Sequence, residues 1–109
     1  MLDCINIFNH DDDQEHYYGV YHRIIDEIDD YVMYLVRSKD LKTWERVAEI
    51  EQYSSQAKVW VDDVSGDILL AMEKSDNGDY VQINHYNTLQ DLIDVKHDAS
   101  FVLPRTLSL

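Results

Sequence analysis

"YVMYLVRSKDLKTWERV", residues 31–47, is the stretch that decides the fold. It opens with an unbroken apolar run, a pattern typical of a strand that is covered on both faces. Ser38 and Asp40 follow, and their side-chain oxygens can accept hydrogen bonds from backbone N–H groups of a tight turn. Leu41 and Trp44 are then expected to turn inward and cover the sheet edge. These four residues are predicted to shape a turn, not to catalyse a reaction.

The same pattern recurs further along the chain. One strand begins at Tyr31 and runs into Asp40-Leu41, and another begins at Tyr80 and runs into Asp91-Leu92. The two copies lie about 50 residues apart, which is the period of one four-stranded propeller blade. This recurrence favours a propeller.

Turn residues divide the second half of the chain into strands. Asp62–Asp67 separates VWV from ILLAM, and Asp76–Asp79 separates ILLAMEK from YVQINHY. The second turn contains Asn-Gly, a strong hairpin signal, because both residues tolerate positive φ. Residues 58–86 are therefore predicted to form three antiparallel strands. Since Ile68–Met72 is apolar throughout, both faces of its sheet should be covered by stacked sheets, as in a sandwich or between neighbouring propeller blades.

Residues 13–32 allow two interpretations. Part of the segment follows the i, i+3, i+4, i+7 spacing of an amphipathic helix that Asp11–Asp13 can cap. Against a helix, Gly19 interrupts the segment, Tyr, Val and Ile dominate it, and Glu27–Asp30 can form a turn. Strands are preferred, and the helix remains the alternative. The residues with helical spacing are Tyr17, Val20, Tyr21, Ile24, Ile25, Ile28 and Val32.

Length and composition indicate one globular, acidic domain. The chain has 109 residues, of which 45% are hydrophobic, and one proline and three glycines leave no visible linker. With 22 acidic and 9 basic residues the net charge is −13, which argues against binding to nucleic acids or anionic membranes. The opening segment lacks the features of a signal peptide, and no run approaches the roughly 20 apolar residues of a membrane span. By default, the chain is expected in the cytoplasm.

The residues that commonly bind metals form no convincing pattern. Cys4 is the single cysteine, so it cannot form an intrachain disulfide and is expected to pack as a small apolar residue. His10, His16 and His22 lie near Asp11–Asp13, and imidazole and carboxylate groups both suit transition metals. Nothing in their spacing defines a coordination geometry. We therefore expect loop residues in contact with solvent, and neither a metal nor another cofactor.

Three stretches together resemble a known family. "YLVRSKDLKTWERV", residues 34–47, is similar to the Ser-x-Asp-Leu-x-x-Trp strand exit of five-bladed β-propeller glycoside hydrolases, the family 43 type and its relatives. Residues 54–92, from "SSQAKVWV" to "TLQDL", resemble the next blade, and "VLPRTLSL", residues 102–109, is similar to the segment that closes it. The resemblance implies an all-β domain, residues 1–109, of antiparallel strands in about two propeller blades. The approximate blades are residues 17–56 and 57–109.

The resemblance also implies what such a chain lacks. Enzymes of this group use a carboxylate base, an orienting Asp and a Glu acid, each on a different blade at the central funnel. The Asp-Pro motif of the base is not recognisable, because Gln56-Ala57 stands at the corresponding strand start. The acid is expected beyond the segment that follows Pro104, so the catalytic residues are unknown. Glu73, Gln56 and Arg105 are the candidates for binding a carbohydrate, since each can reach a sugar hydroxyl.

Two functions follow from these observations. The first is a fragment or degenerate relative of a propeller glycoside hydrolase, because five blades need about 250 residues. Such a chain is expected to be inactive in isolation. Its uncovered sheet faces should lead to self-association, or to binding of a polypeptide that completes the ring. The alternative is a small acidic protein that binds a basic protein, such as an inhibitor or a toxin-neutralising protein.

Overall fold

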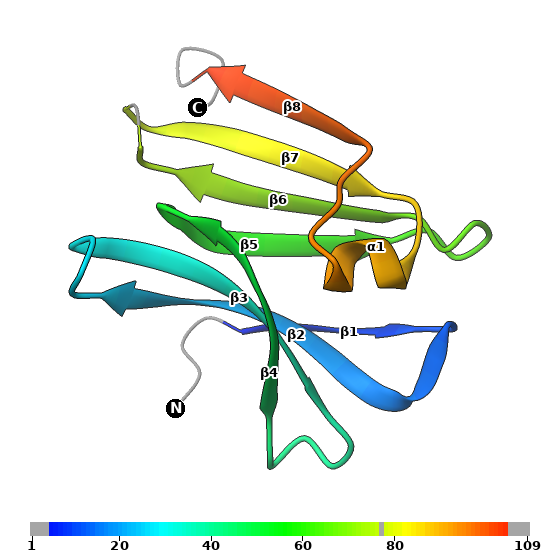
Figure 1. Ribbon diagram of the computed structural model, residues 1–109. Helices are drawn as coiled ribbons and strands as arrows, with labels where there is room; N and C mark the ends of the chain where they lie inside the picture. Colours follow the sequence, from blue (N-terminus) through cyan, green and yellow to red (C-terminus); the bar gives the residue numbers. More distant parts are fainter. Residues whose placement is uncertain (1–4, 77, 105–109) are drawn as a thin grey trace.

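The computed structural model describes residues 5–76 and 78–104, which form eight strands and one short helix (Figure 1). The prediction of an all-β, antiparallel fold is confirmed. Arg105, Cys4 and Asn77, on which parts of the sequence interpretation depend, lie outside the described residues. The elements are β1 (Asn6–His10), β2 (Asp13–Ile25), β3 (Asp30–Ser38), β4 (Glu45–Gln52), β5 (Ser54–Val61), β6 (Ile68–Lys74), β7 (Tyr80–Tyr86), α1 (Leu89–Ile93) and β8 (Ala99–Pro104).

The strands form two four-stranded sheets, each in chain order. The first sheet has the order β1-β2-β3-β4 and the second β5-β6-β7-β8, and all neighbouring strands are antiparallel. One residue, Tyr53, joins the sheets and has a positive φ of 56°. The predicted blades, residues 17–56 and 57–109, differ from the observed sheets at two points. The first sheet already begins at Asn6, and the boundary between the sheets lies at Tyr53 and not after residue 56. Figure 1 shows the two sheets stacked, with α1 at one side of the space between them.

Residues 13–32 are strands, and the helical alternative is wrong. β2 pairs with β3 along most of its length, from Tyr17 opposite Ser38 to Ile25 opposite Asp30. The two strands meet at a turn in which Asp29 has a positive φ of 52°. Cross-strand pairing satisfies the backbone groups of a segment rich in β-branched and aromatic side chains, which favour strands. The glycine at position 19 is explained by packing, since a Cβ there would lie 2.7 Å from a side-chain carbon of Ile5.

The second Asp-Leu pair does not repeat the turn of the first. Thr88 caps the one-turn helix α1, and its side chain accepts a hydrogen bond from the backbone N–H of Asp91 at 3.0 Å. Leu89 and Leu92 lie three residues apart on the same face of this helix and are buried. The approximate repeat in sequence therefore produces two different local structures.

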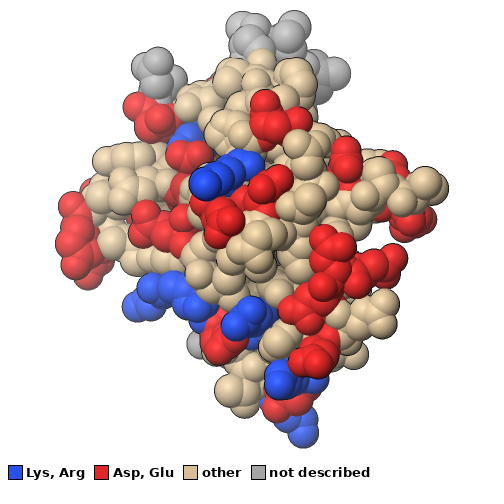
Figure 2. Space-filling view, turned by 45° about the vertical axis from the view of Figure 1, so that its right-hand side comes forward, with Lys and Arg blue, Asp and Glu red and all other residues tan. Residues whose placement is uncertain are grey.

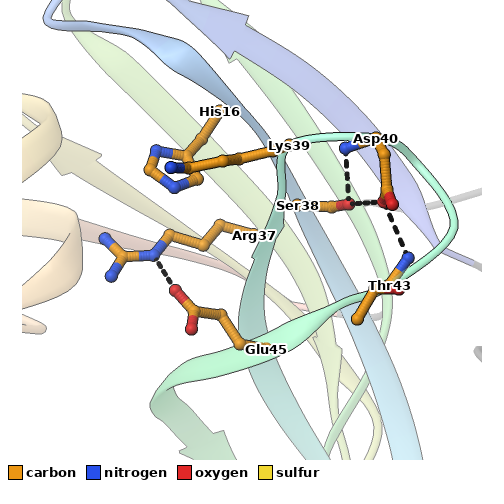
Figure 3. Close-up of a pocket in the computed structure, with 7 residues that line it drawn as sticks. All are labelled: His16, Arg37, Ser38, Lys39, Asp40, Thr43 and Glu45. Atoms are coloured by element: carbon orange, nitrogen blue, oxygen red, sulfur yellow. Dashed lines mark hydrogen bonds and ion pairs between the residues drawn. The ribbon is translucent and has the colours of Figure 1, made fainter.

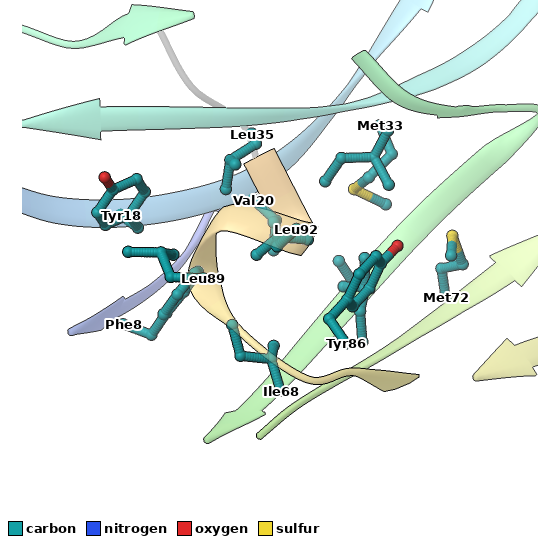
Figure 4. Packing of buried hydrophobic residues seen from close by; sticks show 13 residues of the cluster. Phe8, Tyr18, Val20, Met33, Leu35, Ile68, Met72, Tyr86, Leu89 and Leu92 are labelled. Atoms are coloured by element: carbon teal, nitrogen blue, oxygen red, sulfur yellow. The ribbon is translucent and has the colours of Figure 1, made fainter. Parts of the chain in front are cut away.

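The main core fills the space between the inner faces of the two sheets (Figure 4). Both sheets and α1 contribute to it, so the sheets are held together by one continuous apolar cluster. Strand β3 is buried on both faces, as predicted, because its remaining side chains form a second cluster on the outer face of the first sheet. The main cluster contains Phe8, Tyr18, Val20, Met33, Leu35, Ile50, Ala57, Ile68, Leu70, Met72, Tyr86, Leu89 and Leu92.

Candidate functional site

The turn after β3 is built by two side chains. Ser38 Oγ accepts hydrogen bonds from the backbone N–H groups of Asp40 at 3.2 Å and Leu41 at 2.9 Å. Asp40 Oδ1 accepts hydrogen bonds from the backbone N–H groups of Thr43 at 2.8 Å and Lys42 at 2.9 Å, and these lower the pKa of its carboxyl group. These are the turn hydrogen bonds expected from the sequence.

The prediction for Leu41 is wrong, whereas Trp44 does pack against the sheet, on its outer face. Leu41 has a positive φ of 66°, and 47% of its surface is exposed. The left-handed backbone that the turn requires at this position directs the side chain away from the sheet. Trp44 is half-buried against the outer cluster of Tyr21, Val32, Tyr34 and Val36. Its indole N–H donates a hydrogen bond to the Leu41 carbonyl at 3.2 Å, so the two residues are still linked through the turn.

A pocket of about 250 Å³ lies beside this turn (Figure 3). His16 reaches it from β2, Arg37 from the end of β3, and Glu45 from the start of β4. The other lining residues belong to the end of β3 and the turn: Ser38, Lys39, Asp40 and Thr43. Sequence reasoning identified the turn residues but missed the pocket, because His16 joins it through strand pairing and not through proximity in the chain.

Hydrogen bonds hold the charged groups around the pocket in place. Arg37 Nε donates a hydrogen bond to Glu45, which raises the pKa of the guanidinium and lowers the pKa of the carboxyl. His16 Nδ1 lies 2.8 Å from Asp13 Oδ2, which also accepts a 2.6 Å hydrogen bond from the Tyr18 hydroxyl. This hydroxyl is the main cause of the lowered pKa of Asp13. The pocket thus presents a balanced set of donors and acceptors.

In the part of the chain that the structure describes, six carboxyl groups have a lowered pKa. Every carboxyl group there whose pKa departs from its ordinary value is shifted downward, each by hydrogen bonds that favour the charged form. A general acid for glycoside cleavage needs a raised pKa. The arrangement therefore suits hydrogen bonding to a polar ligand better than acid catalysis. The shifted carboxyl groups are those of Asp13, Asp40, Glu45, Asp62, Asp76 and Asp98.

Two of the predicted carbohydrate-binding residues lie near each other, away from this pocket. Glu73 is exposed near the end of β6 and pairs with Ser55, the neighbour of Gln56. Gln56 occupies a bulge in β5 with a positive φ of 54°, and its backbone N–H donates a 3.3 Å hydrogen bond to His22 Nδ1. Neither Glu73 nor Gln56 lines the pocket beside the turn. Arg105, the third predicted residue, is outside the described ranges.

The expectation of solvent-exposed loop histidines is wrong for His10 and His22, which are buried in β1 and β2 and serve separate structural contacts. His10 Nε2 donates a 2.7 Å hydrogen bond to the Gly66 carbonyl, and His10 Nδ1 accepts one of 3.0 Å from the backbone of Asp12. His22 is buried beneath the Gln56 bulge. Among residues 5–76 and 78–104, no group of three or more His, Cys, Asp or Glu side chains is arranged to hold a metal ion.

His85 forms an ion-pair cluster that sequence reasoning missed. Its Nδ1 forms a hydrogen bond with Asp98 Oδ1, and its Nε2 lies 2.8 Å from Asp67 Oδ2. The hydrogen bond to Asp98, followed by that to Asp67, raises the pKa of the imidazole. Asp67 directly precedes β6 and Asp98 directly precedes β8, the two strands that flank β7. The sequence feature that could have predicted this cluster is that both aspartates directly precede strands that are neighbours of β7.

No helix in the described part of the chain is long and apolar enough to cross a membrane. Comparison of the chain with protein-family models, with curated proteins and with solved structures found no match.

Proposed function

We propose that the chain is a pair of consecutive propeller blades related to five-bladed glycoside hydrolases, with a carbohydrate-related role. The observation that carries this proposal is the pair of four-stranded meanders, which follow each other in chain order and share a core. Propeller blades are four-stranded antiparallel sheets that pack face to face. The Ser38–Asp40 turn, which carries the resemblance in sequence, supports the same interpretation.

Within this proposal the chain binds sugar weakly and does not hydrolyse glycosides. Glycoside hydrolysis needs a positioned acid and a base or nucleophile on opposite sides of the bond. Glu73 and Gln56 lie close together, but Gln56 is an amide and cannot act as either group. The pair can donate and accept hydrogen bonds with sugar hydroxyls.

We expect purified protein to show no turnover of aryl arabinosides, xylosides, mannosides or fructosides, and Glu73→Gln to behave in the same way. Chemical-shift titration with the corresponding free sugars should move the amide signals near Gln56 and Glu73. Glu27→Gln, at the exposed turn between β2 and β3, is the matched control for binding. Turnover by the unmodified chain that disappears in Glu73→Gln would contradict the proposal. Sugar-induced chemical-shift changes confined to residues beside the Ser38 turn would show that the sugar binds at that turn and not at Gln56 and Glu73.

A second candidate function rests on the surface charge. Figure 2 shows Asp and Glu side chains spread over the visible face, with fewer Lys and Arg side chains between them. A net charge of −13 on 109 residues would attract a basic protein and repel an acidic one. This observation supports a small acidic protein that binds and neutralises a basic partner.

Salt dependence tests this second candidate. A complex held by complementary charges should weaken by about tenfold or more between 50 and 500 mM NaCl, because salt screens the attraction. The measurement is calorimetric titration with a basic protein of similar size, and an acidic protein of the same size is the control. Equal affinity at both salt concentrations would exclude binding by surface charge.

A further inference from the structure

The second sheet has an apolar face that no part of the described chain covers. Cross-strand pairs define this outer face: Trp60, Leu69, His85 and Ala99 form one row. Lys58, Ala71, Ile83 and Phe101 form the next row, and Glu73, Val81 and Leu103 form the third. The alternate residues of β5, β6 and β7, such as Val59, Leu70 and Tyr86, face the core between the sheets, whereas Val102 on the inner side of the edge strand β8 is 56% exposed.

Large apolar side chains on this outer face are open to solvent. The exposed fractions are 56% for Trp60, 57% for Phe101 and 42% for Leu103. Leu69, Ala71, Val81 and Ile83 lie between them and are only partly buried. The outer face of the first sheet differs, because Tyr21, Val32, Tyr34 and Val36 are buried there. The prediction that both faces of β6 are covered is therefore correct for one face only.

The edge strand of this sheet, β8, carries no charge, and its one protective residue in the described chain is Pro104 at its end. It has the sequence ASFVLP and ends the strand order. Natural edge strands commonly carry charges, particularly Lys, that prevent pairing with another chain. An exposed apolar face that continues to an uncharged edge strand is typical of an interaction surface.

We propose that the outer face of the second sheet binds the same face of a second copy of the chain, forming a symmetric dimer. The charged side chains in these rows are Lys58 and Glu73, of opposite sign, and His85, which is paired with Asp67 and Asp98, so two copies that meet there bring little net charge together. Stacked sheets of this kind pack about 10 Å apart, with their strands within about 30° of each other.

The size of the face predicts a weak dimer. Four strands spaced about 4.8 Å apart and about six residues long span roughly 20 Å by 20 Å. This is about half of the surface that each partner commonly buries in a stable complex. We therefore expect a dissociation constant of about 10–100 µM. The dimer should tighten as salt rises, because salt screens the repulsion between two chains that each carry a net charge of −13.

Sedimentation equilibrium between about 1 and 500 µM tests the dimer, at 50 and 500 mM NaCl. Phe101→Glu should weaken association by at least about tenfold. Ile24→Glu, at an equally exposed strand position of the first sheet, should leave it unchanged. A stable monomer at 500 µM, or equal weakening by both substitutions, would overturn the proposal.

A measurement on the unmodified chain covers the case in which Phe101→Glu fails to fold. The amide NMR signals that move with protein concentration should belong to β6, β7 and β8. Concentration-dependent signals confined to the first sheet would overturn the proposed surface. Glu73 belongs both to this face and to the proposed sugar-binding pair, so the two proposals are tested separately. Dimerisation is measured without sugar, and the sugar titration is repeated at two protein concentrations to separate sugar-induced from concentration-induced shifts.

Discussion

At the scale of single residues, His85 links three strands through charge. Asp98 and Asp67 stand on either side of its ring, and each accepts a hydrogen bond from an imidazolium. The structure therefore favours the protonated ring, in agreement with the raised pKa of His85. Because the two carboxylates precede β6 and β8, this one side chain ties together the starts of the strands on both sides of β7.

This cluster predicts a pH-dependent contribution to stability. The pKa of His85 is higher in the folded chain than its ordinary value of 6.5, so its contribution is fully present below about pH 6.5. The contribution is lost as the pH rises through the folded-state pKa. The difference in free energy of unfolding between the unmodified chain and His85→Gln should therefore shrink from pH 5.5 to pH 9, as measured by urea unfolding. His97→Gln, an exposed histidine, is the control; a difference that grows with pH would contradict this assignment.

At the scale of elements, the turn between β3 and β4 depends on a buried hydroxyl group. Ser38 is 3% exposed, and its Oγ accepts two backbone hydrogen bonds. Ser38→Ala leaves two N–H groups without these acceptors, which should cost about 1–3 kcal/mol in free energy of unfolding. Urea unfolding measures this loss.

Ser65→Ala is the matched control for the turn. Ser65 is exposed in the turn between β5 and β6, where its Oγ accepts one hydrogen bond, from the backbone of Asp67 at 3.2 Å. Water can replace this acceptor, so the loss should be below about 0.5 kcal/mol. Equal losses in the two variants would show that the Ser38 hydroxyl has no special role in the turn.

At the scale of the whole molecule, the two sheets share one core but differ in their outer faces. Strand β3 is buried on both sides, whereas β6 is buried on one. Salt separates the two kinds of association that this surface and the net charge suggest. Contact between apolar faces of two acidic chains should strengthen as salt rises, and attraction of a basic partner should weaken. Opposite salt dependences in the sedimentation series and in the titration with a basic protein thus distinguish the dimer from a charge-driven complex.

The sequence by itself determined the features that depend on neighbouring residues. The strands, the turn at residues 26–29 and the Ser38–Asp40 hydrogen bonds each form within a few positions of the residues that encode them. For this reason the all-β fold and the antiparallel strands of residues 58–86 could be predicted. The pattern of apolar strands likewise predicted that two sheets stack.

Only the tertiary structure decided which groups from distant segments meet. His16 joins the pocket, and His85 joins Asp67 and Asp98, because strand register brings them together. Leu41 has a positive φ in the turn and is exposed, and the second Asp-Leu pair lies in a helix that buries Leu89 and Leu92 in the core between the sheets. An apolar strand in the sequence does not reveal whether one face or both are covered. Coverage of a face depends on which other parts of the molecule pack against it. No part of the described chain packs against the outer face of the second sheet.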